Sequence, residues 1–162
     1  MGFKAQRALP AISKEFRSAS LISKPEEILQ LGVALLDPLL AAHGFTFRAH
    51  GAGSSSGGPF ASGEFKRDDR RLELHFRHSL GMVSYHHAGR SMSHIDYMRS
   101  VLGKPHSSHY PGFSNDPLDA FLHLRLDLEE YGSEFLAGTD ACLLRRIDQA
   151  ETQPPQRYKL PN

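Results

Sequence analysis

The chain has 162 residues, of which 40% are hydrophobic and 23% charged, and this length and composition are typical of one globular domain. Its 19 lysines and arginines nearly balance its 18 aspartates and glutamates, and a formal net charge of +1 argues against duplex nucleic acid as a partner. The single cysteine, Cys142, excludes an intrachain disulfide and a multi-cysteine zinc site, so that a reducing compartment is expected.

Both ends of the chain are expected to lie outside the folded domain. Residues 1–22 show no sustained hydrophobic period and predict a loosely ordered arm, without the apolar run that a secretion signal needs. Two consecutive prolines predict an extended tail over residues 151–162. No stretch approaches the roughly 18 consecutive apolar residues of a membrane helix. We therefore expect a single domain over residues 23–150, in the cytoplasm and without a membrane partner.

The first helix is expected between Ser23 and Gly44. Ser23, three residues before Glu26, predicts a capping box, and Pro25 is tolerated in a first turn because its missing N–H would have no partner there. We expect Pro38 to kink this helix or to restart it. Apolar residues recur with the helical period at Ile28, Leu31, Leu35 and Leu39.

The segment from Phe45 to His87 has the two-residue period of strands. Phe45 and Phe47 indicate a first strand, and the glycine- and serine-rich run 51–58 is expected to be a loop after it. Short turns then separate three further strands, so that four strands form an antiparallel meander. These three are expected at Phe60–Arg67 with a bulge at Gly63, at Arg71–His78 and at Met82–His87.

Helices return after Gly89. Ser93 is expected to cap a short helix that ends near Leu102, a longer helix is expected from Asp116, and Thr139 is expected to cap a last one. Their apolar stripes can cover the inward side chains of the strands, which are Phe65, Leu72, Leu74, Phe76, Val83 and Tyr85. The predicted fold is therefore α+β, a four-stranded antiparallel meander with helices packed on one face.

The opposite face of the predicted sheet gathers ionisable side chains and is the predicted working surface. Residues of the second, third and fourth strands that point away from the core share this face. It could serve as a binding platform, as an acid/base site, or simply as a solvated face held by cross-strand charge pairs. The candidate binding residues are Glu64, Lys66, Arg71, Glu73, His75, Arg77 and His86, with Ser62 and Ser84 beside them.

Several motifs of specific chemistry are absent or incomplete. The run 51–58 lacks the lysine of a phosphate-binding loop, and no cofactor is expected. His75 and His78 would point to opposite faces of a strand, and the loop pair His106 and His109 falls short of the three or four ligands of a zinc site. The contiguous letters Ser-His-Ile-Asp at 93–96 cannot form a hydrolase triad, which is assembled across space.

Three segments together resemble a known group of proteins. The stretches Leu35–Phe45, Gly63–Arg67 and Leu72–Arg77, in this order of helix and strands, are similar to small bacterial α+β immunity proteins of contact-dependent inhibition and other polymorphic toxin systems. Those families share no catalytic motif, so the resemblance assigns no functional residue. The near-neutral charge differs from the strongly acidic profile of immunity proteins that bind basic nuclease toxins.

Two functions of different classes follow from these observations. The resemblance implies a non-enzymatic protein that binds and neutralises a cognate toxin domain. The alternative is a small metal-independent ribonuclease or hydrolase that uses Glu73 together with His75 and His86. A ligand-sensing regulatory domain is a third possibility.

Overall fold

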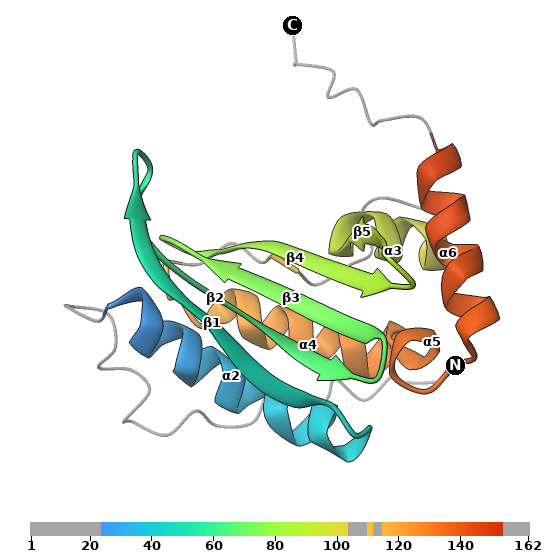
Figure 1. Cartoon of the computed structure of the whole chain (residues 1–162), viewed down its shortest axis with the longest axis horizontal. Coiled ribbons are helices and arrows are strands. Elements are labelled where there is room, and N and C mark those ends of the chain that lie inside the picture. The colour runs from blue at the N-terminus through green and yellow to red at the C-terminus, as the bar shows by residue number, and fades with distance from the viewer. Residues whose placement is uncertain (1–23, 104–109, 112–114, 154–162) are drawn as a thin grey trace, which may run out of the picture.

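The computed structural model describes residues 24–103, 110–111 and 115–153 and shows an α+β domain with an antiparallel sheet (Figure 1). Among these residues, no helix has both the length and the apolar character needed to cross a membrane. The helices are α2 (Pro25–Ala42), α3 (His94–Leu102), α4 (Asp119–Tyr131), α5 (Ser133–Leu136) and α6 (Asp140–Thr152). The strands are β1 (Thr46–Ser55), β2 (Gly58–Arg67), β3 (Arg70–Phe76), β4 (Leu80–His87) and β5 (Arg90–Ser93).

The sheet is a meander with one strand more than predicted. Its five strands lie in the order β1-β2-β3-β4-β5, and each pairs antiparallel with the next. The additional strand β5 has only four residues, Arg90–Ser93, and is too short to show a clear alternation in the sequence. Its backbone is positioned by the turn at Ala88 and Gly89, both of which have positive φ, as in the tight turns of β-hairpins.

The glycine- and serine-rich run was predicted to be a loop, and this prediction is wrong. β1 continues through Ser55, which pairs with Gly58, so that the connection to β2 is a two-residue turn. The hydrogen bonds between paired strands are made by the backbone, so glycine and serine can form them as well as other residues do. A strand of such small residues is stable where the neighbouring strand provides the side chains that pack against it. Here Phe60 of β2 does so, since its ring lies against the backbone of Gly53.

The predicted bulge lies on the neighbouring strand. The register of β1 and β2 shifts between Ala49 and Gly51, which leaves His50 as the extra residue, opposite Ser62 and Gly63. Gly63 itself is required because a Cβ there would overlap the ring of Phe47. The glycine therefore provides space for an aromatic side chain of β1, and the bulge next to it turns His50 toward β2.

Helix α2 is continuous, although a kink or restart was predicted. Its N-cap is Lys24, whose N–H donates to the Glu27 carboxylate (3.3 Å), while Ser23 lies outside the described residues. Pro38 lies inside the helix on its exposed side. Leu36 and Leu40 on either side of it are fully buried, and burying two such side chains contributes about 3–6 kcal/mol, which offsets the roughly 3 kcal/mol cost of an interior proline.

The other helix caps largely agree with the sequence. Ser93 Oγ accepts from the N–H of Asp96 (3.1 Å) at the start of α3, which confirms its role as a cap. Thr139 likewise accepts from the N–H of Cys142 (3.3 Å) in α6. α4 begins at Asp119, two residues later than a cap at Asp116 and a first helical residue at Pro117 would place it, and Asp116 forms a turn before it by accepting from the N–H of Leu118.

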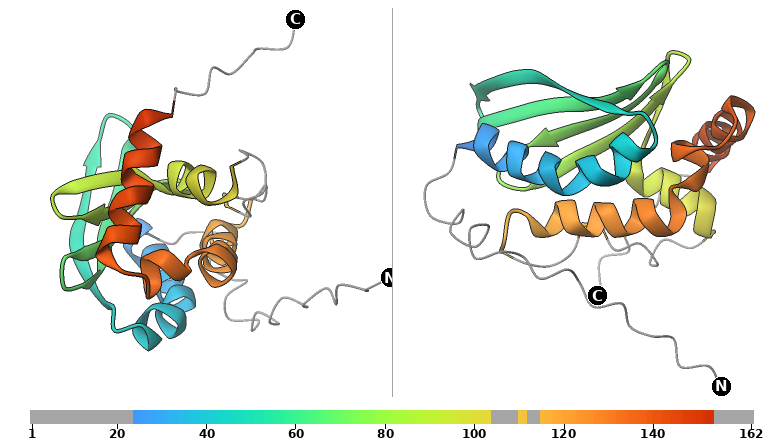
Figure 2. Two further views of the ribbon diagram at one scale, coloured as in Figure 1. Left: turned by 90° about the vertical axis from the view of Figure 1, so that its right-hand side faces the viewer. Right: turned by 90° about the horizontal axis from the view of Figure 1, so that it is seen from below.

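The hydrophobic core lies between the sheet and two helices. Helices α2 and α4 run side by side beneath one face of the sheet, while α3, α5 and α6 gather near β5 (Figure 2). All six side chains that were predicted to point inward are buried, namely Phe65, Leu72, Leu74, Phe76, Val83 and Tyr85. The prediction that helices pack on one face of the sheet is therefore confirmed.

Close packing of α2 on α4 gives a first testable prediction. Gly32 of α2 is buried, and a Cβ there would overlap the ring of Phe121, which is fully buried in α4. Gly32→Val is therefore expected to lower the free energy of unfolding by about 1–3 kcal/mol, as measured by urea denaturation. The matched control Ala34→Val, on the exposed side of the same helix, should cost no more than about 0.7 kcal/mol. Equal losses in both variants would contradict this account.

Candidate binding surface and its support

The face of the sheet that points away from α2 and α4 is open. Among the described residues, no helix covers it (Figure 2). The predicted binding residues all belong to this face, here called the outer sheet face. Its members are Arg48 and His50 of β1, Phe60, Ser62, Glu64 and Lys66 of β2, Arg71, Glu73 and His75 of β3, Arg77 just after β3, and Met82, Ser84 and His86 of β4.

Glu64 is the centre of one charged cluster on this face. Its Oε2 atom lies 3.1 Å from Nη1 of Arg71 and 3.4 Å from Nε2 of His50. Only 7% of the Glu64 side chain is exposed, so the expectation that this carboxylate faces water is wrong. Its partners shield it instead. His50 was not among the predicted residues, because only the bulge in β1 turns it toward Glu64.

Glu73 is the centre of a second pair. It lies directly opposite Glu64 in the register of β2 and β3, and like charges in that position repel. His86 compensates, since its Nε2 atom is 2.7 Å from Oε2 of Glu73. Each of the two carboxylates thus has a diagonal partner on β3 or β4. This arrangement holds both carboxylates in contact with basic side chains of the same face.

His75 lies apart from this pair, although the sequence grouped the two histidines. His75 is opposite Met82, whereas His86 is opposite Arg71, four residues further along β3. That separation corresponds to about 13 Å along the strand. The two histidines therefore cannot act on one reacting atom in the way that the predicted acid/base site requires.

His75 belongs instead to an apolar strip across the outer sheet face. Its ring stacks on the ring of Phe60, with 5.2 Å between the two centroids. The guanidinium carbon of Arg77 lies 5.8 Å from the centroid of the same Phe60 ring. Met82, 66% exposed, is the cross-strand neighbour of His75. The sequence reasoning missed Phe60 and Met82. Both are in phase with the polar residues of their strands, and that pattern could have identified them.

The outer sheet face carries an excess of positive charge. It has four arginine or lysine side chains, Arg48, Lys66, Arg71 and Arg77, against Glu64 and Glu73. Within the described part of the chain, no carboxylate pairs with Arg48 or Lys66, and the guanidinium of Arg77 donates to the Ser55 hydroxyl (2.9 Å) without a carboxylate partner. These cations remain available to an acidic partner.

A buried polar chain supports the edge of the sheet beneath this face. The hydroxyl of Tyr85 lies 2.6 Å from Nδ1 of His94, and Nε2 of His94 lies 2.9 Å from Oδ2 of Asp127. The same oxygen accepts from the backbone N–H of Tyr110 (3.0 Å). His94 is 2% exposed and Asp127 fully buried, and neither was predicted to matter.

Burial decides the protonation of Tyr85, at one end of this chain. Burial raises the pKa of Tyr85 well above its usual value, and Tyr97 and Asp127 raise it further, so that the phenol stays protonated. The protonated phenol of Tyr85 donates to Nδ1 of His94, and Nε2 of His94 contacts the Asp127 carboxylate. Because His94 is 2% exposed and both of its ring nitrogens contact other side chains, this chain is a structural support for β4 and α3.

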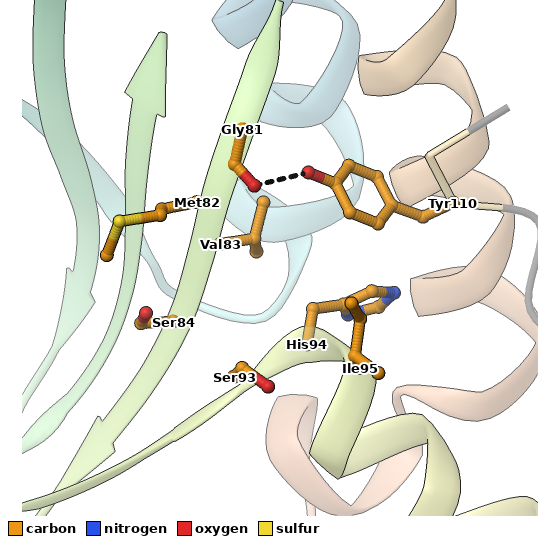
Figure 3. Close-up of a pocket in the computed structure, with 8 residues that line it drawn as sticks. All are labelled: Gly81, Met82, Val83, Ser84, Ser93, His94, Ile95 and Tyr110. Carbon is orange, nitrogen blue, oxygen red and sulfur yellow. Dashed lines mark hydrogen bonds between the residues drawn. The ribbon is translucent and has the colours of Figure 1, made fainter. Parts of the chain in front are cut away.

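A small pocket opens where β5 ends beside β4, and it is here called the edge pocket (Figure 3). Its volume is about 240 Å³. The hydroxyl of Tyr110 closes one side by donating to the carbonyl oxygens of Leu80 (2.6 Å) and Gly81 (3.0 Å). The lining residues are Gly81, Met82, Val83, Ser84, Ser93, His94, Ile95 and Tyr110.

Within the described residues, no group of three or more histidine, cysteine, aspartate or glutamate side chains could hold a metal ion. The loop histidines His106 and His109 lie outside the residues that the structure describes.

The fold and the surface define an α+β domain in which helices cover one face of an antiparallel sheet and the other face is open. Comparison of the chain with protein-family models, with curated proteins and with solved structures gives no match. Function therefore has to be argued from the surface itself.

Proposed function

We propose that this chain is a non-enzymatic, immunity-type protein that binds a cognate toxin domain through the outer sheet face and neutralises it in the bacterial cytoplasm. The open outer sheet face, with its paired charges and apolar strip, carries the proposal. The resemblance found in the sequence supplies the class of partner. A preformed surface of this kind loses little conformational entropy on binding.

The chemistry of the face selects an acidic partner. Arg48, Lys66 and Arg77 would meet carboxylates of the toxin domain, and such complementarity speeds association and excludes basic surfaces. Phe60 and Met82 would supply the apolar contact, because aromatic and arginine side chains at the centre of an interface carry most of the binding energy. The partner surface that we propose is therefore acidic with at least one apolar projection.

The test uses the purified chain and the protein encoded directly upstream of it, with the affinity measured by calorimetry. We expect a complex, and the double variant Lys66→Glu with Arg77→Glu should weaken it by about tenfold or more per reversed charge, because like charges would then face each other. Circular dichroism should show an unchanged fold, since both side chains lie on the outer sheet face.

Arg145→Glu serves as the matched control. Arg145 is exposed on α6, away from the outer sheet face, and its reversal should leave the affinity unchanged. A wild-type chain that forms no complex and does not restore growth of cells expressing the upstream protein would overturn the proposal.

The enzymatic alternative retains one specific observation, the 2.7 Å contact between Glu73 and His86. A carboxylate at this distance can hold an imidazole as a general base. The separation of His75 from that pair removes the second histidine that the alternative relied on. Cleavage of RNA by the purified chain, abolished by Glu73→Ala but not by His75→Ala, would favour this alternative over the binding function.

A further inference from the structure

The hairpin of β1 and β2 extends beyond the rest of the sheet. Pairing of β2 with β3 ends at Ala61, opposite Phe76, whereas β1 and β2 continue to pair as far as Ser55 and Gly58. The residues beyond Ala61, which are residues 53–60, are here called the hairpin extension. It projects past the ends of β3 and β4 (Figure 1). Its three residues on β2 make it about 10 Å long, without the turn.

The hairpin extension adds nothing to the hydrophobic core. Between Phe45 and Ala61, a stretch that the structure describes throughout, no residue is part of the buried core, and only Phe47 packs against it. Every residue from Arg48 to Gly57 is exposed. Ordering a chain segment costs conformational entropy, and an isolated two-stranded hairpin is at best marginally stable in water. Stability of the domain therefore gives no reason for this extension.

Side chains that follow β3 nevertheless hold the hairpin extension in one direction. Nη2 of Arg77 donates to the Ser55 hydroxyl (2.9 Å), and Nε2 of His78 lies 3.3 Å from the carbonyl oxygen of Gly57. A Cβ on Gly57 would overlap the guanidinium of Arg77, so that glycine allows this close approach. The extension is thus a preformed projection, and a preformed element loses little conformational entropy on binding.

The hairpin extension is thin and polar at its end, and it contains no carboxylate. Its two strands lie about 4.8 Å apart, and past Gly53 the side chains of β1 and of the turn are only hydroxyl groups, those of Ser54, Ser55 and Ser56. Arg77 adds a positive charge beside Ser55. A narrow cleft can receive such a projection, and carboxylates on the cleft walls would complement its donors and its charge.

We propose that the hairpin extension enters a narrow cleft of the protein partner whose walls carry carboxylates, while the rest of the outer sheet face contacts the rim of the cleft. Ser55 lies on the same face of the hairpin as Phe60, because Gly58, the residue opposite Ser55, is two residues from Phe60. The extension therefore continues the outer sheet face, and one partner can contact both.

Insertion into a cleft also explains how binding would neutralise the partner. Active sites lie in concave pockets, so an element that fills such a cleft blocks access to it. This inference deepens the proposed function and rests on it, since the cleft is taken to belong to the same toxin domain.

The test uses a shortened hairpin in which residues 54–59 are replaced by Asn-Gly. These two residues form a tight turn between Gly53 and Phe60, and the change keeps Phe60 and Arg77 in the chain. We expect the circular dichroism and the urea midpoint of the wild type, because the removed residues lie outside the core. The affinity for the protein encoded directly upstream, measured by calorimetry, should fall at least about tenfold.

Ser54→Trp tests the width of the cleft. Ser54 is exposed, and an aromatic residue is well tolerated in a strand, so the fold should persist. A bulky ring on a hairpin that enters a narrow cleft should lower the affinity at least about tenfold. Arg145→Trp is the matched control, because it places the same ring on an exposed position of α6, and it should bind as the wild type does.

Hydrogen exchange of the wild-type complex gives a direct measurement of insertion. The amides of Ser56 and Gly57, in the exposed turn, should exchange at least about tenfold more slowly when the partner is bound. If the wild type forms the complex but the shortened hairpin binds equally well, or exchange at the turn is unchanged, insertion is ruled out while the proposed function stands. If the wild type forms no complex, both fall together.

Discussion

Asp127→Ala is expected to lower the free energy of unfolding by about 3–5 kcal/mol, one of the two largest effects predicted for this chain. The carboxylate is fully buried and accepts hydrogen bonds from His94 and from the backbone of Tyr110. Its removal leaves two buried donors without an acceptor, at about 1–3 kcal/mol each, and opens a cavity. Loss of a partner from a buried His–Asp pair is costly for the same reason. Urea denaturation would measure the loss.

Asp148→Ala is the matched control for this change. Asp148 pairs with Arg90 at 2.7 Å, but 62% of its side chain is exposed to solvent. Exposed ion pairs contribute about 0–1 kcal/mol, so the control should be close to wild type. If Asp127→Ala cost no more than Asp148→Ala, the chain from Tyr85 to Asp127 would not be the support of β4 and α3 that the structure indicates.

The second large effect is a loss of stability at alkaline pH. Burial raises the pKa of Tyr97 and of Tyr110 to about 12, from 10.0, and raises that of Tyr85 further. Below pH 10 the phenols are protonated in both the folded and the unfolded chain, and stability does not depend on them. Between pH 10 and 12 the unfolded chain releases protons that the folded chain retains, so stability falls as pH rises. Tyr97 and Tyr110 together account for about 5 kcal/mol.

A loss of this size is comparable to the whole stability of many small domains, which is about 5–15 kcal/mol. The chain is therefore expected to unfold cooperatively before its buried phenols titrate. Phenolate absorbance and circular dichroism, followed together against pH, should change in one transition. In Tyr97→Phe the loss of unfolding free energy across this pH window should be smaller by about 2–3 kcal/mol, because one phenol with a raised pKa has been removed. Phenolate formation with normal pKa values in a folded chain would contradict the prediction.

The sequence allowed the α+β class, the antiparallel meander and the faces of the strand residues between Phe60 and His87 to be predicted. The reason is local: alternation from Phe60 to His87 assigns each side chain to one face of the sheet, whatever the rest of the chain does. Leu72, Leu74 and Phe76 are buried, and Arg71, Glu73 and His75 lie on the outer sheet face, as expected. Capping residues such as Ser93 also follow from local rules and were correctly predicted.

Some features near the surface could not be predicted from the residues of one strand, because they depend on which strands pair and in which register. The run 51–58 has no strand propensity of its own, and its residues 51–55 are part of β1 only because β2 lies beside them. His50 reaches Glu64 because the register of β1 shifts by one residue, and no local pattern reports such a shift. The separation of His75 from His86 likewise follows from the register of β3 and β4.

By itself, then, the sequence determined which side chains of β2, β3 and β4 share the outer sheet face and which apolar ones face the helices, because the period of a strand is set by the geometry of its own backbone. Only the tertiary structure decided which of those side chains touch. It brought Tyr85, His94 and Asp127 together from three elements and formed a pocket between β4 and Tyr110. Contacts between residues far apart in the chain depend on how whole elements pack, and local residue patterns do not encode that packing.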